Sequence, residues 1–256
     1  MYLTIDIGGT KTLIALFSKR GRVIRRVKFK TPYGKERFIR DLVKNLQGFT
    51  NRKIVAIAMA IPGTVYKNYS VSFGNRDWGR VDLLAPIKKM FSCPIYLEND
   101  ANLAAIYEST GVPGKTVFLT FSTGIGGGVA RQGKLLAGTD EFEPGHKKYE
   151  YNGKKAEWED IAGASAIEKA YHVDVATDLR RKTIMMDIAQ RISLGLPDII
   201  ASYRPQNIIL GGPMGKIFKR YVKYLPKLGV KFRRPKRPLE SVIYGCYLYA
   251  KQQERG

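Results

Sequence analysis

The sequence predicts an α/β fold built from two similar halves, and three observations support this prediction. Over about the first 110 residues, the apolar patterns follow the order strand, strand, strand, helix, strand, helix, strand, helix. A turn containing glycine joins the first two strands, as in a β-hairpin. A second strand–glycine–strand pattern begins near residue 116, although no sequence repeat accompanies it. Strands that alternate with helices after an initial hairpin indicate a mixed sheet covered by helices.

The first half begins with three short strand patterns and an amphipathic helix. Tyr2–Ile7 and Thr12–Phe17 flank the pair Gly8-Gly9, and Arg22–Phe29 follows as a third strand. Lys35–Leu46 carries its apolar residues at helical spacing. The remaining predicted elements are a buried strand at Lys53–Ala60, a helix at Val81–Met90, a strand at Ile95–Leu97 and a helix at Ala101–Tyr107.

The second half repeats the hairpin and then becomes mostly helical. Thr116–Phe121 and Ile125–Arg131 are its two strands. The later predicted elements are helices at Ala164–Tyr171 and Arg180–Tyr203 (broken or kinked at Pro197), a strand at Asn207–Leu210, a turn at Gly211-Gly212, and helices at Met214–Tyr224 and Leu239–Gln252. We therefore expect one domain over residues 1–110, completed by the final helix at 239–256, and a second domain over residues 111–238.

The composition excludes several classes of protein. With 44% hydrophobic and 26% charged residues, disorder of the whole chain is excluded. The two cysteines, Cys93 and Cys246, lie far apart, which excludes a disulfide framework and a CxxC-type zinc site. The longest apolar run, Ile54–Pro62, is too short to span a bilayer, and no leader pattern precedes the first strand. We expect a cytoplasmic protein without a membrane partner.

The charge balance is unusual. Lys and Arg number 44 against 22 Asp and Glu, a formal net charge of +22. Such an excess attracts polyanions, such as nucleotides, nucleic acid or polyphosphate. A general basic character of the source organism's proteins explains the same number equally well. The densest basic stretch, Lys231–Pro238, has the composition of a solvated loop.

Three glycine turns stand at predicted strand ends. In Asp6–Lys11 a carboxylate precedes two glycines. The exposed N–H groups of the glycines suit a phosphate, and the carboxylate of Asp6 suits Mg²⁺. Ser122–Val129 holds four glycines in five positions, which weakens a strand unless a ligand approaches the backbone. Gly211-Gly212 follows a buried strand and precedes a helix. A plain hairpin turn explains any one of them, whereas the three together favour a nucleotide site.

Polar side chains gather at three further places, each with a structural alternative. Asn99 and Asp100 open a predicted helix, where helix capping alone would favour both residue types. Glu143 and His146 lie in a Pro/Gly segment, and Glu159 precedes an Ala/Gly/Ser run, so ordinary solvated loops would also explain them. Converging carboxylate, amide and imidazole groups are what a polyhydroxylated ligand requires.

Taken in this order, the motifs resemble the ROK family (repressor, open reading frame, kinase), whose members are sugar kinases and sugar-responsive repressors. The resemblance runs from end to end and implies an α/β fold with two actin/hexokinase-like (ribonuclease H-like) domains around a cleft. It assigns donor binding to the three glycine turns and sugar binding to a set of polar residues, with Asp100 as the general base. The donor residues are Asp6 (with Mg²⁺), Gly8, Gly9, Thr10, Lys11, Thr123, Gly124, Gly211 and Gly212; the sugar residues are Asn75, Asn99, Asp100, Glu143, His146 and Glu159.

The sequence departs from the family pattern in two ways. Many members carry a cysteine-rich zinc loop after the Glu-x-Gly-His motif, but Tyr149–Glu157 holds no cysteine, so we expect no zinc. The repressors carry an N-terminal helix-turn-helix, whereas this sequence begins with its first strand, so we expect no DNA-binding domain.

The resemblance thus implies a homodimeric kinase of the hexokinase or glucokinase type. It would transfer a phosphoryl group from ATP to the 6-hydroxyl of glucose or a related hexose. Polyphosphate glucokinases belong to the same family, are similarly short and lack the zinc loop, so polyphosphate stays open as donor. A non-catalytic sugar binder on the same fold also stays open.

Overall fold

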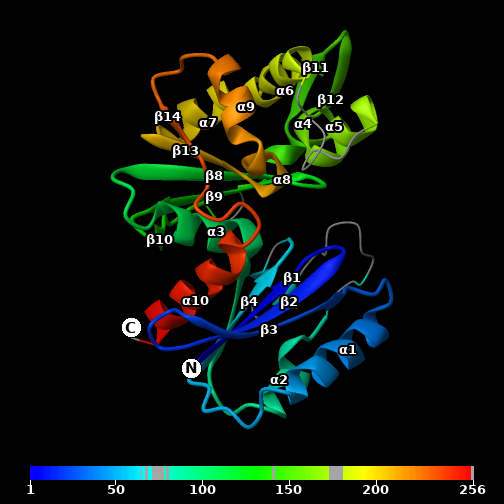
Figure 1. The fold of residues 1–256 in the computed structure, drawn as a ribbon, viewed down its shortest axis with the longest axis vertical. Coiled ribbons are helices and arrows are strands. Elements are labelled where there is room, and N and C mark those ends of the chain that lie inside the picture. The colour runs from blue at the N-terminus through cyan, green and yellow to red at the C-terminus, as the bar shows by residue number, and fades with distance from the viewer. Residues whose placement is uncertain are drawn as a thin grey trace. The chain divides into compact units, whose positions relative to one another are not determined.

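In this computed structural model the chain is described at residues 1–63, 65–66, 69–70, 78, 81–139, 142–172 and 181–254. It divides into two compact units: unit 1, Met1–Tyr107 with Val242–Gly256, and unit 2, Glu108–Ser241. Each unit contains a five-stranded mixed sheet (Figure 1). Within the described ranges, no helix is both long and apolar enough to cross a membrane.

The sheet of unit 1 begins with a hairpin and continues with parallel strands. Its order is β3-β2-β1-β4-β7, antiparallel among the first three strands and parallel from β1 to β7. The strands are β1 (Tyr2–Ile7), β2 (Lys11–Phe17), β3 (Val23–Lys30), β4 (Ala56–Ile61) and β7 (Ile95–Asn99). All six residues of β4 are buried, as the continuous apolar run predicted. A further two-stranded pair is formed by β5 (Val65–Tyr66) and β6 (Tyr69–Ser70).

In the part of the chain that the structure describes, four helices belong wholly or partly to unit 1. They are α1 (Lys35–Gln47), α2 (Leu84–Lys88), α3 (Asp100–Ser109) and α10 (Ser241–Gln253). Helix α2 is shorter than the predicted Val81–Met90, because Asp82 Oδ1 accepts the N–H groups of Leu84 and Ala85 at 2.9 Å each and so fixes a later start. Helix α10 lies against α3, where a side chain at Gly245 would collide with the Leu103 carbonyl.

The sheet of unit 2 has the same strand pattern. Its order is β10-β9-β8-β13-β14, with an antiparallel hairpin followed by parallel strands. The strands are β8 (Lys115–Phe121), β9 (Ile125–Arg131), β10 (Lys134–Leu135), β13 (Asn207–Gly211) and β14 (Lys231–Arg233). The expectation that the basic stretch at Lys231–Pro238 is only a solvated loop was wrong at its start. Lys231–Arg233 pairs with β13, and the Lys231 N–H donates to the Gln206 carbonyl at 3.0 Å.

Six α-helices cover the sheet of unit 2 in the described segments. They are α4 (Trp158–Ala162), α5 (Ala164–Tyr171), α6 (Lys182–Ser193), α7 (Leu196–Tyr203), α8 (Gly212–Lys216) and α9 (Phe218–Tyr221), with 3₁₀ turns at Pro144–His146 and Val222–Tyr224. The predicted break near Pro197 is confirmed, since α6 ends at Ser193 and Pro197 lies in the first turn of α7.

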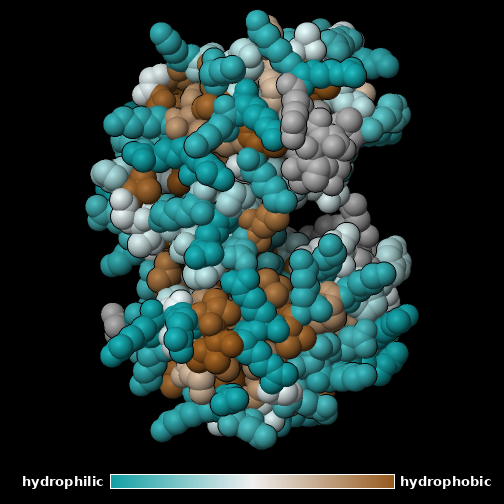
Figure 2. All heavy atoms as spheres, viewed as in Figure 1, coloured by the Kyte–Doolittle hydropathy of each residue, from teal (hydrophilic) through white to brown (hydrophobic). Residues whose placement is uncertain are grey.

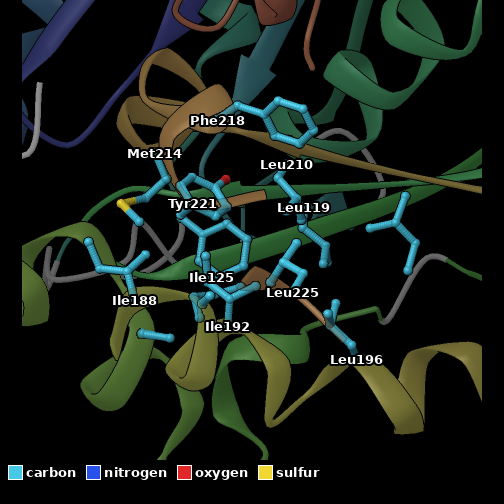
Figure 3. Packing of buried hydrophobic residues seen from close by; sticks show 14 of the residues in the cluster. Leu119, Ile125, Ile188, Ile192, Leu196, Leu210, Met214, Phe218, Tyr221 and Leu225 are labelled. Atoms are coloured by element: carbon cyan, nitrogen blue, oxygen red, sulfur yellow. The ribbon is translucent and has the colours of Figure 1, made fainter. Parts of the chain in front are cut away.

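The predicted single helix at Met214–Tyr224 was wrong, because its ladder is interrupted at Ile217. The apolar spacing still serves its purpose: Met214, Ile217, Phe218 and Tyr221 all enter the core of unit 2. Figure 3 shows Met214, Phe218 and Tyr221 packed over Leu119, Ile125 and Leu210 of the sheet. Helical periodicity therefore identified the buried face correctly but not the continuity of the helix.

The basic residues are spread over both units. On β3, Arg25, Arg26, Lys28 and Lys30 are exposed, so this edge strand presents a row of cations. Figure 2 shows hydrophilic side chains over most of the visible face of each unit, with a hydrophobic area on unit 1. The excess positive charge is thus spread over the surface of both units, and strand β3 carries several of the basic residues.

Candidate functional site

The first glycine turn joins β1 to β2 in unit 1. Ile7 pairs with Thr12, and the Gly8 N–H donates to the Lys11 carbonyl at 3.0 Å. A Cβ atom at Gly8 would lie 2.9 Å from that carbonyl, so only glycine fits this tight turn without a shift. Gly9, Thr10 and Lys11 are exposed, and the turn therefore offers its backbone to a ligand.

Asp6 lies at the end of β1, directly before this turn. Burial, together with the nearby carboxylate of Asp100, raises the pKa of Asp6 to about 7. Two carboxylates that oppose each other's ionisation are relieved by a divalent cation, and carboxylate oxygens are the ligands that Mg²⁺ prefers. The residues present therefore fit Mg²⁺ at Asp6.

Asn99 and Asp100 stand where β7 passes into α3. The Asn99 side-chain oxygen accepts the N–H groups of Ala101 at 2.8 Å and Asn102 at 3.1 Å, so Asn99 caps the helix. Its amide nitrogen donates to the Gly63 carbonyl at 3.0 Å. Asp100 is the first helical residue, and its Oδ1 also accepts from the Ala101 N–H, at 2.7 Å. Helix capping thus explains Asn99, but it does not explain why residue 100 is a carboxylate.

Glu98 is a residue of this region that the sequence analysis missed. Its Oε1 accepts the backbone N–H of Asn99 at 2.8 Å and the Nδ2 of Asn102 at 3.0 Å. It therefore fixes the backbone from which Asn99 and Asp100 project. No motif marked Glu98, because only the strand-to-helix geometry brings it under both partners. Asn75, the remaining predicted sugar residue, lies outside the described residues.

The second glycine turn joins β8 to β9 in unit 2. The Ser122 N–H donates to the Gly124 carbonyl at 2.9 Å, and Thr123 is exposed. The Ser122 carbonyl accepts the Ala164 N–H at 2.8 Å, which ties the turn to the start of α5. At Gly124 an added Cβ would collide with the carboxylate of Glu159. A side chain at residue 124 would therefore displace Glu159, a predicted site residue.

Gly211 and Gly212 end β13 and begin α8, next to the second turn. Gly212 has φ +68°, and an added Cβ would lie 2.5 Å from the Phe121 carbonyl. At Gly211 the same atom would collide with the ring of Phe118. Both conformation and space therefore demand glycine at residue 212, which lies against Phe121, the residue that precedes Ser122.

His146 and Glu159 come together in unit 2, and the solvated-loop alternative was wrong for Glu159, which lies in a helix. His146 ends the 3₁₀ turn Pro144–His146, and Glu159 lies in the first turn of α4. The His146 Nδ1 lies 3.9 Å from Glu159 Oε1, and Glu159 Oε2 accepts the Ile125 N–H at 3.2 Å. Burial raises the pKa of Glu143, opposed by the nearby His146 and reinforced by Glu159.

The segment after His146 is a β-hairpin rather than a loop. β11 (Lys148–Tyr151) pairs with β12 (Lys154–Glu157) around Asn152-Gly153. Asn152 has φ 52° and Gly153 φ 71°, the conformation for which Asn-Gly is favoured in two-residue hairpins. The sequence carried this hairpin signal at Asn152-Gly153, and the sequence analysis did not use it.

The hairpin brings a further carboxylate, Glu157, against His146. Glu157 Oε2 lies 3.0 Å from His146 Nδ1, and this hydrogen bond raises the pKa of His146. Suitable ligand atoms of His146, Glu157 and Glu159 lie within 4.8 Å of one another. These are three N and O atoms, whereas a structural zinc site uses four ligands, mostly sulfur and nitrogen. The absence of bound zinc stays a prediction.

Comparison with known proteins identifies the family. The model of the ROK family matches residues 2–232, and the chain belongs to this family. A glucokinase from Thermotoga maritima is 32% identical over 64% of this chain and 58% of its own length. A xylose repressor from Bacillus spizizenii is 28% identical over 61% of this chain and 48% of its own length. This chain thus spans only about half the length of the curated relatives it matches.

Solved structures support the fold class. The ROK family glucokinase from Streptomyces griseus in complex with glucose and AMPPNP superposes with a TM-score of 0.77 at 21% identity, over 98% of this chain and 99% of that one. The inorganic polyphosphate/ATP-glucomannokinase from Arthrobacter sp. strain KM gives a TM-score of 0.77 at 22% identity, over 98% of each chain. The predicted actin/hexokinase-like α/β fold class is confirmed.

Proposed function

We propose that the protein is a sugar kinase that transfers a phosphoryl group from ATP to a hexose hydroxyl. The expected acceptor is the 6-hydroxyl of glucose or of a related sugar. Membership of the ROK family and similarity to kinases of this family support the class. The observation that carries the proposal is the start of α3, where Asn99 caps the helix and Asp100 adds a carboxylate. The two units would act as the two domains of the enzyme, working in the cytoplasm as a homodimer.

The chemistry assigned to this chain is in-line displacement. Asp100 accepts the proton of the sugar hydroxyl as its oxygen bonds to the terminal phosphorus of the donor, whose bond to the leaving oxygen breaks. The glycine turns at Gly8-Gly9, Thr123-Gly124 and Gly211-Gly212 would bind the donor phosphates and nucleoside through exposed backbone groups. Thr10 and Lys11 would add side-chain contacts to them. Mg²⁺, held by Asp6, would supply charge neutralisation on the phosphates when bound.

Each unit carries candidate sugar-binding residues of its own. Asn99 and Asp100 in unit 1, together with Asn75, and Glu143, His146 and Glu159 in unit 2 supply carboxylate, amide and imidazole partners for hydroxyl groups. The raised pKa of Glu143 and the ion-pair distance between His146 and Glu159 support a shared polar site within unit 2. Hydrogen bonds from sugar hydroxyls to such charged acceptors are stronger than those between neutral groups.

A coupled assay that crosses a panel of hexoses and N-acetylated hexosamines with ATP and polyphosphate tests the proposal. We expect ATP-dependent, Mg²⁺-dependent phosphorylation of at least one hexose. The similarity to a xylose repressor supports the alternative of sugar binding without catalysis. Calorimetric sugar binding with no turnover from either donor would favour that alternative and overturn the kinase proposal.

A further inference from the structure

The β11–β12 hairpin has a register that returns the chain to His146. Lys148 pairs with Glu157, and the Trp158 N–H donates to the Lys147 carbonyl at 2.8 Å. The first residue before the hairpin and the first after it are therefore joined by a backbone hydrogen bond. Glu157 is held beside His146 by this register and not by its own side chain alone.

Two carboxylates on neighbouring helices fasten the hairpin. Asp198 of α7 accepts the Tyr149 hydroxyl at 2.7 Å and pairs with Lys147 Nζ at 2.9 Å. Asp187 of α6 accepts the Tyr151 hydroxyl, and the guanidinium of Arg191 lies over the Tyr151 ring. Both tyrosines of β11 are thus anchored to α6 and α7. Because Glu157 of β12 pairs with Lys148 of β11, this anchoring also holds Glu157 in place.

The hydrogen bond to Glu157 decides which nitrogen of His146 is available. A carboxylate only accepts, so the neutral ring carries its proton on Nδ1, toward Glu157 Oε2 at 3.0 Å. The Nε2 atom is then an acceptor on the opposite edge of the ring. Glu159 does not replace Glu157 in this contact, because its Oε1 is 3.9 Å from Nδ1 and its Oε2 accepts from Ile125.

We infer that Glu157 is a positioning residue for sugar binding, which fixes the tautomer and orientation of His146 so that Nε2 accepts a sugar hydroxyl. This inference rests on the proposed function, since the sugar is the ligand assigned to His146. No motif pointed to Glu157, which lies outside the set of residues predicted from the sequence. Groups that orient a ligand-binding imidazole through its other nitrogen contribute strongly to affinity in metal sites, and the same geometry applies here.

Steady-state kinetics on a double-mutant cycle tests the inference. Glu157→Ala should raise the sugar KM about tenfold and leave the donor KM within about twofold, whereas Glu157→Gln, which keeps an acceptor for Nδ1–H, should fall between wild type and Glu157→Ala. In a His146→Gln background, Glu157→Ala should add no further increase. Glu150→Ala, which removes an exposed carboxylate from the same hairpin, is the matched control and should behave as wild type. Fully additive effects, or an equal rise in donor KM, would overturn the inference.

Nitrogen NMR of the histidines gives a readout that needs no activity. The chain has only two histidines, so His172, an exposed residue at the end of α5, serves as internal reference. At about pH 9, where histidine is neutral, wild-type His146 should show the Nδ1–H tautomer and Glu157→Ala should lose it. An unchanged tautomer in Glu157→Ala overturns the inference whatever the kinetics. The predicted tautomer in a protein that neither binds nor phosphorylates any sugar would instead place the failure in the proposed function, and would refute the sugar contact of Nε2.

Discussion

At the scale of single residues, the site is built from groups whose neighbours already occupy part of their hydrogen-bonding capacity. Asn99 caps α3, Glu98 holds the backbone under it, and Glu159 accepts a backbone N–H at the second glycine turn. Such bonds restrict the side chains before any ligand binds, which lowers the entropy lost on binding. A substitution that keeps the size of a side chain and removes its charge therefore tests the role of that residue by itself.

The proposed role of Asp100 as general base is tested by Asp100→Asn. We expect kcat to fall by roughly 10²–10⁴, since an amide cannot accept the hydroxyl proton, with sugar affinity within a few-fold of wild type. Asp41→Asn, on α1, removes a half-buried carboxylate that lies 4.0 Å from Arg37 Nε and should have no effect. Rapid-quench kinetics together with calorimetric sugar binding measure both quantities. A kcat near the wild-type value would contradict the assignment of Asp100.

The raised pKa of Asp6 predicts how cation binding depends on pH. Its pKa in the folded protein is about 7 against the ordinary 3.8, so the folded protein holds this proton more tightly than the unfolded chain. Without cation, the contribution of Asp6 to stability therefore falls as pH rises from about 4 to about 7. A cation competes with the proton, so Mg²⁺ or Mn²⁺ affinity should rise up to about tenfold per pH unit below 7 and level off above it.

Calorimetric titration with Mn²⁺ at several pH values measures this dependence. Asp6→Asn should remove both the binding and its pH dependence, while the control Asp41→Asn on α1 keeps them. Affinity that does not vary between about pH 5.5 and 8 would contradict Asp6 as the titrating ligand.

At the scale of elements, the sequence patterns predicted strands and helices well where one face is buried. The hairpins β1–β2 and β8–β9 and the fully buried β4 follow directly from apolar runs and glycine turns. The failures have local causes: Asp82 shortened α2 and the interruption at Ile217 broke the helix after β13. These are decided by individual hydrogen bonds and dihedral angles, which periodicity does not record.

The candidate site divides in the same way. Its glycines could be predicted, because glycines at the ends of predicted strands marked all three turns, and the structure shows that an added Cβ at Gly8 or Gly212 would meet backbone atoms. Glu98 and Glu157 could not, because their partners are set by the end of a strand and by the register of a hairpin. Motifs mark residues that touch ligands more readily than residues that hold those residues in place.

The fastening of the β11–β12 hairpin is tested by Asp187→Ala. Asp187 accepts from Tyr171 at 2.6 Å and Arg191 at 2.5 Å as well as from Tyr151. Burial alone would raise the pKa of Asp187, but these bonds together hold it below its usual value. Removing the carboxylate leaves three donors without it and should lower the free energy of unfolding by about 2 kcal/mol. Met186→Ala, an exposed neighbour on the same helix, should change it by less than about 0.5 kcal/mol.

Chemical denaturation measures these stabilities, and hydrogen exchange locates the loss. Faster exchange should appear at the β11–β12 amides in Asp187→Ala. Exchange that increases uniformly over unit 2, with the hairpin no more affected than the core, would contradict a fastening role.

At the scale of the whole molecule, the same strand order occurs in both units while the sequence shows no repeat. Each sheet has a hairpin followed by two parallel strands, and each hairpin turn is rich in glycine. The shared order preserves the places where the backbone turns at a strand end, and those places carry the predicted donor site. The net charge of +22 is distributed over both units and is not confined to those turns.

The charge leads to a prediction about donor choice. If the basic surface guides polyphosphate, activity with that donor should fall steeply from low to physiological salt, because a chain that touches many Lys and Arg side chains releases many counterions. Activity with ATP depends on fewer contacts, chiefly the glycine turns and Mg²⁺, and should fall much less. The competing explanation, a general basic character of the organism's proteins, predicts no polyphosphate turnover at any salt. It is the better supported of the two, because the charge is spread rather than clustered.

Both donors are assayed across a salt series, with Arg25→Gln/Arg26→Gln on the exposed edge strand β3 as a charge-reduced variant. Polyphosphate turnover that decreases with salt and is weakened by the variant would establish guidance by the surface, whereas its absence even at low salt would discard guidance and leave ATP as the donor.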